Sequence, residues 1–307
     1  ERGVFMEIIS VVPRGYCQGV VRAIQIARKT AQDNPDTPVY MLGMIVHNQF
    51  VVDACKAIGI RFVEEAGKTR SELLDRIDSG IVIFTAHGIS DDVKEKAIRK
   101  GLKVVDASCL DVIKTHDLVK QHIQQDGDVL YIGKKGHPES EGTVSLSKRV
   151  HLITSCEDIQ RLDGLKNVLI TNQTTLSILD TSAIIEECLK KYPDATVAKE
   201  ICNATRVRQE AVMHLKDTDV LIVVGDARSN NSNQLRKIAL ASGIKEAYLI
   251  DSIKDLKEEM VKEKNRIAVT SGSSTPNELT QQVITFLKQY ALDGKWDLPE
   301  DITVRLL

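Results

Sequence analysis

The stretch "EIISVVPRGYCQGVVRAIQIA", residues 7–27, decides the fold. An apolar run reaches Pro13, a turn that contains Cys17 follows, and from Val20 onward apolar residues recur at helical spacing. A short apolar run bounded by turn residues predicts a buried strand, and apolar residues three or four apart predict a helix. The stretch therefore predicts a strand, a turn that presents a thiol, and an amphipathic helix.

The bulk composition is that of a globular protein. The chain has 307 residues, of which 42% are hydrophobic, and a formal net charge of −2. At roughly 100–200 residues per domain, this length predicts two or three domains. The small net charge argues against a generally basic nucleic-acid-binding or membrane-surface protein, although a local basic pocket is compatible with it. No apolar run approaches the roughly 20 residues of a membrane span.

Cysteine usage predicts a reducing environment. Six cysteines are too few for a disulfide scaffold in a chain of this length. Residues 1–6 show no basic segment followed by a long apolar stretch, so we expect no secretory signal. We therefore expect a cytoplasmic location, where cysteines are free, catalytic or metal-bound.

A repeat runs through the chain. Cys17, Cys109 and Cys202 lie 92 and 93 residues apart, and each follows a short β-rich stretch and precedes a helical pattern. Two further strands end in polar loops after each cysteine, first at His47, His137 and Asn231, and then at His87, Thr174 and Ser274. We predict three small α/β units, at 1–103, 104–196 and 197–307, with a C-terminal tail over 285–307 that docks back. The units share almost no sequence identity, so chance spacing remains the alternative.

The predicted fold class is α/β, with mainly parallel sheets in three units related by a pseudo-three-fold. Val- and Ile-rich strands that alternate with helical patterns are typical of βαβ units. Ligands of such sheets bind outside the carboxyl ends of the strands, where all nine polar loops occur. We therefore expect the loops to converge on one central cavity.

The six cysteines fall into two sets. Cys55, Cys156 and Cys188 lie in or beside helical patterns and are expected to be buried small hydrophobic residues. The repeated cysteines are each expected at a helix N-terminus, which stabilises a thiolate. Three converging thiolates would bind a soft metal and leave one ligand position open, because closed zinc and cluster sites usually have four protein ligands. Burial as a core residue remains the alternative for any single one of them.

The polar loops suit an anion and a proton. Loops rich in Ser and Gly at a helix start bind phosphate through backbone N–H groups. For "SNNSN", residues 229–233, an ordinary N-cap and turn is an equally good interpretation. In "GHPESEGT", residues 136–143, Glu139 could transfer a proton, oriented by hydroxyls of "TNQTT", residues 171–175; a solvated carboxylate is the alternative. Four further histidines are expected to be structural: His116, His122, His151 and His214.

These motifs together resemble one family over nearly the whole chain. In order they are "PRGYCQGV", "VHNQFVVD", "TAHGIS", "VDASC", "GHPESEGT", "TNQTTLS", "EICNATRVRQEAV", "SNNSN" and "SGSSTP". The chain resembles the 4-hydroxy-3-methylbut-2-enyl diphosphate reductases, the IspH/LytB family, which act last in the methylerythritol phosphate route to isoprenoids. The set is highly specific, although no single motif would be.

The resemblance implies a site and a reaction. It implies a [4Fe–4S] cluster held by Cys17, Cys109 and Cys202, whose fourth iron is open to the substrate hydroxyl. It implies a diphosphate pocket formed by His47, His87, His137, Thr174, Ser229, Asn230, Asn231 and Ser274. It implies proton delivery by Glu139, assisted by Thr174, in a two-electron reductive dehydroxylation that yields isopentenyl and dimethylallyl diphosphate. Ferredoxin or flavodoxin is the implied electron donor, with no nucleic acid or membrane partner.

Two positions depart from the family pattern. Family members commonly carry Pro after the second cysteine, where this chain has Leu110, and Ser where it has Asn230. Leu110 puts only the local turn in doubt, and Asn230 keeps an amide donor. An iron–sulfur dehydratase, a cluster-binding redox sensor and a zinc protein remain alternative functions.

Overall fold

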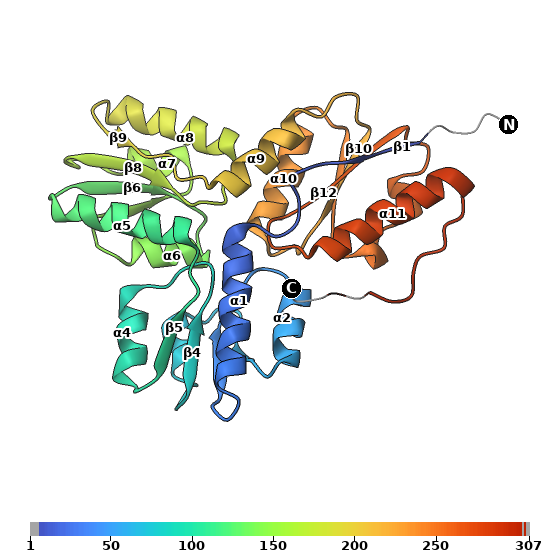
Figure 1. Ribbon diagram of the computed structural model, residues 1–307. Helices are drawn as coiled ribbons and strands as arrows, with labels where there is room; N and C mark the ends of the chain where they lie inside the picture. Colours follow the sequence, from blue (N-terminus) through green and yellow to red (C-terminus); the bar gives the residue numbers. More distant parts are fainter. Residues whose placement is uncertain (1–5, 303, 305–307) are drawn as a thin grey trace. The chain divides into compact units, whose positions relative to one another are not determined.

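The computed structural model describes residues 6–302 and 304, which include three parallel four-stranded sheets with their helices (Figure 1). This confirms the predicted fold class. The chain divides into two compact units, which are described separately. Unit 1 comprises Glu1–Gln18, His47–Ala54 and Asn203–Leu307, and unit 2 comprises Gly19–Val46 and Cys55–Cys202.

Unit 2 contains two of the sheets. The first has the order β3-β2-β4-β5 and the second the order β7-β6-β8-β9. The first sheet consists of β2 (Val39–Leu42), β3 (Arg61–Val63), β4 (Ile81–Phe84) and β5 (Lys103–Asp106). The second consists of β6 (Asp128–Ile132), β7 (Val150–Ile153), β8 (Val168–Asn172) and β9 (Thr196–Val197).

Eight helices accompany these strands in chain order. They are α1 (Gln18–Asp33), α2 (Gln49–Ala57), α3 (Arg70–Leu74), α4 (Asp91–Arg99), α5 (Leu110–Gln124), α6 (Pro138–Val144), α7 (Cys156–Gln160) and α8 (Ile178–Lys191). The first residue of α1 and most of α2 fall in unit 1. The apolar spacing that predicted a helix after Cys17 is confirmed by α1, which buries Val20, Ile24 and Ala27 on one face.

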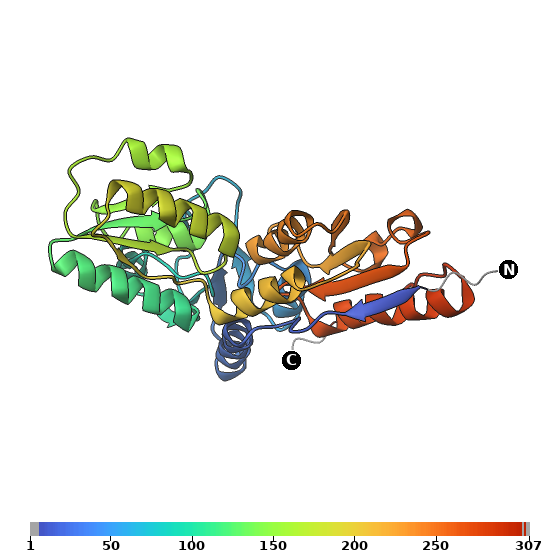
Figure 2. The same cartoon turned by 90° about the horizontal axis from the view of Figure 1, so that it is seen from above.

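Unit 1 contains the third sheet, in the order β1-β12-β10-β11. Its strands are β1 (Glu7–Ser10), β10 (Val220–Val224), β11 (Glu246–Ile250) and β12 (Arg266–Ser271). Its helices are α9 (Asn203–Met213), α10 (Asn230–Ala241) and α11 (Asn277–Asp293), with short 3-10 turns at Ile253–Asp255 and Glu258–Met260. Figure 2 shows α11 running alongside β1, which agrees with the packing of these two elements.

Strand β10 shows why this sheet is covered on both faces. Successive side chains of a strand point to opposite faces. Val220, Ile222 and Val224 pack with Leu279, Val283 and Leu287 of α11, whereas Leu221 and Val223 pack with Val212 of α9 and with Leu235 and Ile238 of α10. A strand buried on both faces must be apolar throughout, which is how its "VLIVV" reads.

The three sheets share one strand order. If the strands of each sheet are numbered in chain order from β2, β6 and β10, with β1 counted last in its sheet, each sheet has the order second, first, third, fourth. Hydrogen bonds repeat as well: the glycine after each of these strands donates its N–H to the last residue of the neighbouring strand. The three bonds are Gly43 to Val63, Gly133 to Ile153 and Gly225 to Ile250, at 2.8–3.0 Å between N and O. This repetition argues against chance spacing of the cysteines.

The strand before each cysteine belongs to a different sheet than the predicted boundaries imply. β5 pairs with β4 and β9 with β8, while β1 pairs with β12 at the other end of the chain. β5 and β9 therefore each complete the preceding sheet, because a helical crossover returns the chain to that sheet in parallel, whereas β1 completes the last sheet of the chain. The division into three units at 103/104 and 196/197 stays a prediction, as does a central cavity.

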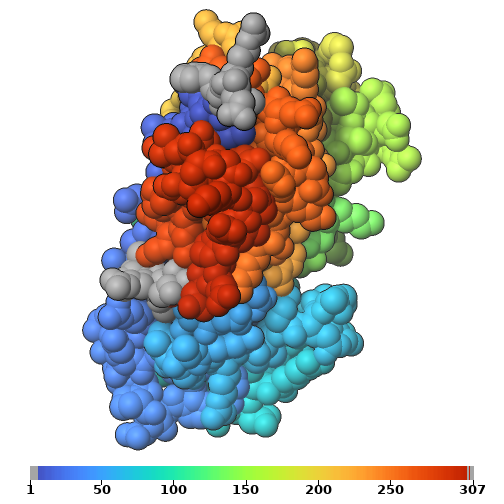
Figure 3. All heavy atoms as spheres, turned by 90° about the vertical axis from the view of Figure 1, so that its right-hand side faces the viewer, coloured from blue at the N-terminus to red at the C-terminus, as the bar shows by residue number. Residues whose placement is uncertain are grey.

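The tail after α11 packs onto unit 1. Trp296 contacts the rings of Phe286 and Tyr290 edge to face, with centroids 4.8 and 5.0 Å away. Leu298 and Ile302 join the same apolar cluster. Docking is thus confirmed for the described part, although 285–293 is helix; residues 303 and 305–307 lie outside the described residues. The red surface in Figure 3 is α11 with this segment.

Among the helices of residues 6–302, none combines the length and apolarity of a membrane span.

One glycine after β12 is required by a close approach. A Cβ on Gly272 would lie 2.0 Å from Oγ of Ser232, a fully buried residue of α10. We expect Gly272→Ala to lower the free energy of unfolding by about 1–3 kcal/mol, because overpacking forces neighbouring atoms to shift. Denaturant unfolding should show partial recovery in Gly272→Ala/Ser232→Ala, which removes the clashing hydroxyl. Equal stability of Gly272→Ala and the wild type would contradict this packing.

Candidate functional site

The three repeated cysteines occupy equivalent places. Each is the residue directly before a helix, respectively α1, α5 and α9. Each donates its backbone N–H to a carbonyl in the loop after the neighbouring strand: Cys17 to Ser273, Cys109 to Ala86 and Cys202 to Thr174, at 2.9–3.0 Å. None of the three forms a disulfide, and each is partly exposed. All three thiols therefore stand at the carboxyl edge of a sheet, beside a helix N-terminus.

The other cysteines lie elsewhere. Cys55 and Cys188 are fully buried, and burial raises the pKa of each thiol to about 12. The prediction of burial is wrong for Cys156, which is exposed at the first residue of α7. Its helix has five residues, of which Ile159 is the one that is buried, so this short helix places little of its surface in the core.

Leu110 does not disturb the turn at Cys109. It is the first residue of α5, is 61% exposed, and follows an extended N-cap residue. Proline is common at this first helical position because its fixed φ suits a helix start, but other residues adopt the same φ. The departure from the family pattern is therefore local and tolerated.

In unit 1, the start of α10 lies against the loop after β12. Ser229 is the N-cap of α10, and its Oγ accepts from the N–H and the hydroxyl of Ser232 at 3.3 and 3.1 Å. Asn231 is buried, and its Oδ1 accepts from the N–H of Ser273 at 3.0 Å. The same residue's Nδ2 donates to the hydroxyl of Thr205 at 3.2 Å. Thr205 was missed from the sequence, although it lies three residues after Cys202.

His47 joins this group through its backbone. The hydroxyl of Ser274 donates to the His47 carbonyl at 3.2 Å, and Ser274 is buried. Because Cys17 bonds the carbonyl of the adjacent Ser273, one loop connects the first cysteine, the α10 start and the His47 segment. Unit 1 thus brings together Cys17, His47, Ser229, Asn230, Asn231 and Ser274 around the loop after β12.

In unit 2, Glu139 and Thr174 meet. Glu139 is 2% exposed, and its two carboxylate oxygens accept from the N–H and the hydroxyl of Thr174, at 2.7 and 3.0 Å. Burial raises the pKa of Glu139 to about 7, against the lowering effect of the two Thr174 hydrogen bonds; the nearby Asp111 adds a smaller upward effect. A carboxyl group with this pKa can give and take a proton near neutral pH.

His137 precedes this acid and has a defined ring orientation. It is the N-cap of α6, and its Nδ1 accepts from the N–H of Glu139 at 3.2 Å. In a neutral ring the proton is then on Nε2, which can donate to a ligand. His87 stands edge to face with His137, with ring centroids 5.7 Å apart, and its Nδ1 is 3.4 Å from the Thr85 hydroxyl.

Gln173 also supports this region and was missed by sequence reasoning. Its Oε1 accepts from the N–H of Lys134 at 3.0 Å and from the hydroxyl of Ser140 at 3.1 Å. Its Nε2 donates to Thr175 at 3.0 Å. Gln173 therefore ties the loop after β8 to the loop after β6 and to α6. Its place beside Thr174 in "TNQTT" was the available signal.

The histidines expected to be structural are placed in agreement with that expectation. His116 is buried in α5, and its pKa is lowered, mainly by burial. The ring of His122 contacts the Asn167 carbonyl at 2.5 Å, and His151 lies 3.6 Å from an Asp128 oxygen. His214 lies just after α9, outside the loops described above.

The predicted ligand set is divided between the units: Cys17 belongs to unit 1, and Cys109 and Cys202 to unit 2. Within the described ranges, no three His, Cys, Asp or Glu side chains are grouped as a metal site requires.

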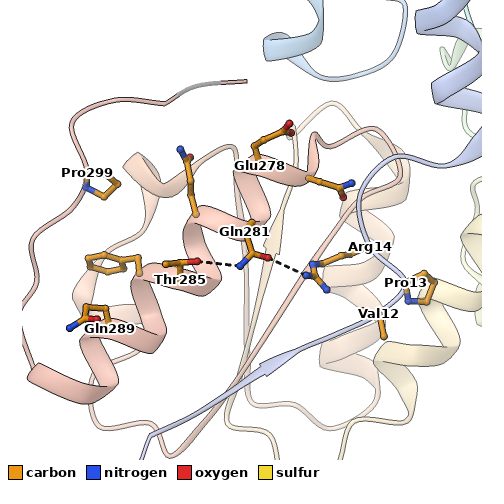
Figure 4. A pocket seen from close by; sticks show the side chains of 11 residues that line it. Val12, Pro13, Arg14, Glu278, Gln281, Thr285, Gln289 and Pro299 are labelled. Atoms are coloured by element: carbon orange, nitrogen blue, oxygen red, sulfur yellow. Dashed lines mark hydrogen bonds between the residues drawn. The ribbon is translucent and has the colours of Figure 1, made fainter. Parts of the chain in front are cut away.

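One cavity is lined by none of the loop residues named above. It has a volume of about 1190 Å³ and lies in unit 1, along one face of α11 (Figure 4). Figure 4 shows Arg14 donating to Gln281, which donates to Thr285, at 3.5 and 3.2 Å. None of the predicted site residues lines this cavity.

A family model described as LytB protein matches residues 8–288. The chain belongs to the LytB family. A protein from Symbiobacterium thermophilum named 4-hydroxy-3-methylbut-2-enyl diphosphate reductase is 47% identical over 94% of this chain and 99% of its own length. A protein of the same name from Anoxybacillus flavithermus is 48% identical over 93% of this chain and 91% of its own length.

Solved structures agree with this LytB membership. The E-1-hydroxy-2-methyl-but-2-enyl-4-diphosphate reductase from Plasmodium falciparum is 29% identical, with a TM-score of 0.87 over 97% of this chain and 95% of its own. A second structure, titled (E)-4-hydroxy-3-methyl-but-2-enyl diphosphate reductase, the terminal enzyme of the non-mevalonate pathway, is 30% identical, with a TM-score of 0.65 over 92% of this chain and 99% of its own.

The Glu139–Thr174 pair can be tested without any ligand. Thr174→Val removes the hydroxyl bond that favours the carboxylate, so we expect the pKa of Glu139 to rise above about 7. Isotope-edited infrared titration of the carboxyl group would measure it. Thr143→Val is the matched control, because the Thr143 hydroxyl bonds the backbone carbonyl of Glu139 and not its carboxylate. A Glu139 pKa unchanged in Thr174→Val would show that this bond is absent in solution.

Proposed function

We propose that this chain is a 4-hydroxy-3-methylbut-2-enyl diphosphate reductase, an oxidoreductase of the non-mevalonate isoprenoid route. The similarity to reductases over nearly the whole chain gives the reaction class. The observation that carries the proposal is the buried Glu139, bonded twice to Thr174 and with a pKa near 7. A reductive removal of a hydroxyl group needs such an acid to protonate the departing oxygen.

The polar loops of unit 1 suit the diphosphate. Ser229 accepts two hydrogen bonds at Oγ, which leaves its own proton to donate to a ligand. The first N–H groups of α10, at Asn230 and Asn231, are the donors that a helix N-terminus offers an anion. We assign Ser229, Asn230, Asn231, Ser274 and His47 to the diphosphate, together with His87, His137 and Thr174 of unit 2.

The three repeated thiols fit the chemistry of an iron–sulfur cluster. Each stands directly before a helix at the carboxyl edge of a sheet, and cysteine sulfur is the ligand that holds such clusters. The proposal is that Cys17, Cys109 and Cys202 hold a [4Fe–4S] cluster with one iron free of protein ligands. When bound, the cluster would supply single electrons and a Lewis-acidic iron.

The reaction is balanced by two electrons and two protons: the substrate's C–O bond breaks, a C–H bond forms, and water leaves. Glu139 holds the proton for the leaving oxygen, and Thr174 orients its carboxyl group. Buried His137 donates from Nε2 to an anionic ligand while its Nδ1 stays bonded to Glu139 N–H. Ferredoxin or flavodoxin is the proposed electron donor, and a cytoplasmic location would keep the thiols reduced.

Cluster ligation is tested by replacing each thiol. We expect Cys17→Ser, Cys109→Ser and Cys202→Ser each to abolish cluster retention or activity after anaerobic reconstitution, because a hydroxyl is a poor ligand for iron that prefers soft thiolates. Iron content and the visible absorption spectrum would measure retention. Cys156→Ser is the matched control, since Cys156 is exposed in α7 and is not one of the three repeated cysteines. Full activity in any of the first three variants would contradict the ligand set.

Proton delivery is tested by pH. Glu139 must be protonated to act as an acid, so kcat/KM should be highest below pH 7 and fall as the pH rises through about 7. Glu139→Gln keeps the size but has no proton to release, so kcat should drop by about 10²–10⁴-fold and this inflection should vanish. Turnover with an artificial one-electron donor would measure both. Normal turnover with an intact cluster would remove Glu139 from the reaction.

A further inference from the structure

A buried carboxylate lies in unit 1 beside the proposed diphosphate loops. Asp226 is 4% exposed and follows β10 after a single glycine. Its Oδ1 accepts from the backbone N–H and the Nε of Arg228, both at 2.8 Å. Its Oδ2 accepts from an Arg228 terminal nitrogen at 2.6 Å and from the N–H of Gln49 at 3.2 Å. Four donors therefore converge on one buried side chain.

These bonds join two segments that are far apart in sequence. Gln49 is the first residue of α2 and lies two residues after His47. The Asp226 carbonyl accepts from the N–H of Ser229, the N-cap of α10. Arg228 completes the connection, because the terminal nitrogen that donates to Oδ2 of Asp226 also donates to Oε1 of Gln49, at 3.2 Å. Asp226 thus holds the His47 segment on one side and the Ser229–Asn231 turn on the other.

The charge of Asp226 is unexpected for this place. A negative charge next to an anion site weakens binding by Coulomb repulsion. The pair of Asp226 and Arg228 is not an ordinary surface ion pair, because the acid is buried while the Arg228 side chain is 51% exposed. Burial opposes the charged form, but the Arg228 hydrogen bonds outweigh it, so the pKa of Asp226 is lowered and the group is a carboxylate at neutral pH.

We propose that Asp226, supported by Arg228, positions the anion-binding loops of unit 1 by holding the Gln49 N–H and the Ser229 turn in one arrangement. The inference rests on the proposed function, since it assigns a supporting residue to the same diphosphate site. Asp226 acts through its neighbours and does not touch the ligand. Its contribution is to fix the geometry of the donors. This effect on anion binding is larger than the repulsion between its charge and the anion.

Positioning and simple electrostatics predict opposite signs. If Asp226 acts only as a charge, Asp226→Asn removes a repulsion and inorganic diphosphate binds more tightly. If it positions the loops, the amide nitrogen introduced by the substitution cannot accept a hydrogen bond, so at least one bond from Arg228 or Gln49 is lost. Diphosphate then binds more weakly. We expect Kd to rise by about tenfold, the loss typical of one bond to a charged group. Isothermal titration of the full chain with inorganic diphosphate would measure it.

Two controls separate geometry from charge. Asp251→Asn also removes a negative charge from this neighbourhood. Asp251 accepts a hydrogen bond from the Ala227 N–H, and burial and the charge of Asp226 raise its pKa, but it has no bond to Gln49. It should leave Kd unchanged or lower it. Gln49→Pro removes only the N–H and the side-chain bonds of Gln49 without changing charge, and proline is tolerated at a first helical position. Gln49→Ala keeps the N–H, so the difference between these two variants isolates the bond to Asp226.

We expect Gln49→Pro to weaken diphosphate binding about as much as Asp226→Asn, and the double variant to be no weaker than either, because both remove one shared bond. In the reconstituted enzyme, Asp226→Asn should raise KM with little change in kcat, since Glu139 and the thiols are untouched. A general loss of folding would instead lower the apparent kcat with KM unchanged, because fewer active molecules remain, and would also lower the melting temperature.

The outcomes distinguish the inference from the proposed function. Diphosphate that binds the wild type but binds Asp226→Asn or Gln49→Pro equally well or more tightly would overturn the positioning role alone. A wild type that binds no diphosphate would overturn the anion assignment and, with it, the inference. Weaker binding in both variants, with Asp251→Asn and Gln49→Ala near the wild type, would establish it.

Discussion

The architecture depends on one hydrogen bond that is made three times. The backbone N–H of Cys17, Cys109 or Cys202 bonds a carbonyl in the loop beyond the neighbouring strand, just where the chain enters a helix. This bond extends the parallel ladder past the last strand residue, so the thiol stands at the carboxyl edge with its backbone already satisfied. A reactive group at a strand end can be aimed accurately only if the sheet beneath it is rigid, and each sheet here packs against helices.

Burial then divides the polar groups into two kinds of chemistry. In unit 2, Glu139 is buried, and the two hydrogen bonds from Thr174 do not offset the cost of burying its charge. Its pKa is therefore raised to about 7. In unit 1, buried Asp226 has four donors, including a guanidinium, and is ionised. The pKa values of two buried acids are thus shifted in opposite directions, because the number and charge of their donors differ. The first suits proton transfer, and the second suits holding a loop.

Much of the fold followed from local pattern, because parallel strands buried on both faces are short Val/Ile runs. The strand ends at His47, His87, His137, Thr174, Asn231 and Ser274 were predicted for that reason. Strand partners were not predictable in the same way: nothing in residues 7–10 indicates that they pair with Arg266–Val269 at the far end of the chain. Thr205, Gln173 and Asp226 were missed because a Thr, Gln or Asp near a turn has an ordinary local role, and only its partners distinguish it.

The sequence by itself determined the repeat of cysteines, the order of strands and helices, and the residue types available at each strand end, since these depend on spacing and side-chain periodicity. Only the tertiary structure decided which strand completes which sheet, that Thr174 bonds Glu139, and that Asp226 reaches Gln49 across 177 residues. The physical reason is that pKa values and loop positions depend on desolvation and on specific donors, both of which arise only when distant segments pack together. Composition and spacing state which groups exist, whereas their protonation and orientation belong to the folded chain.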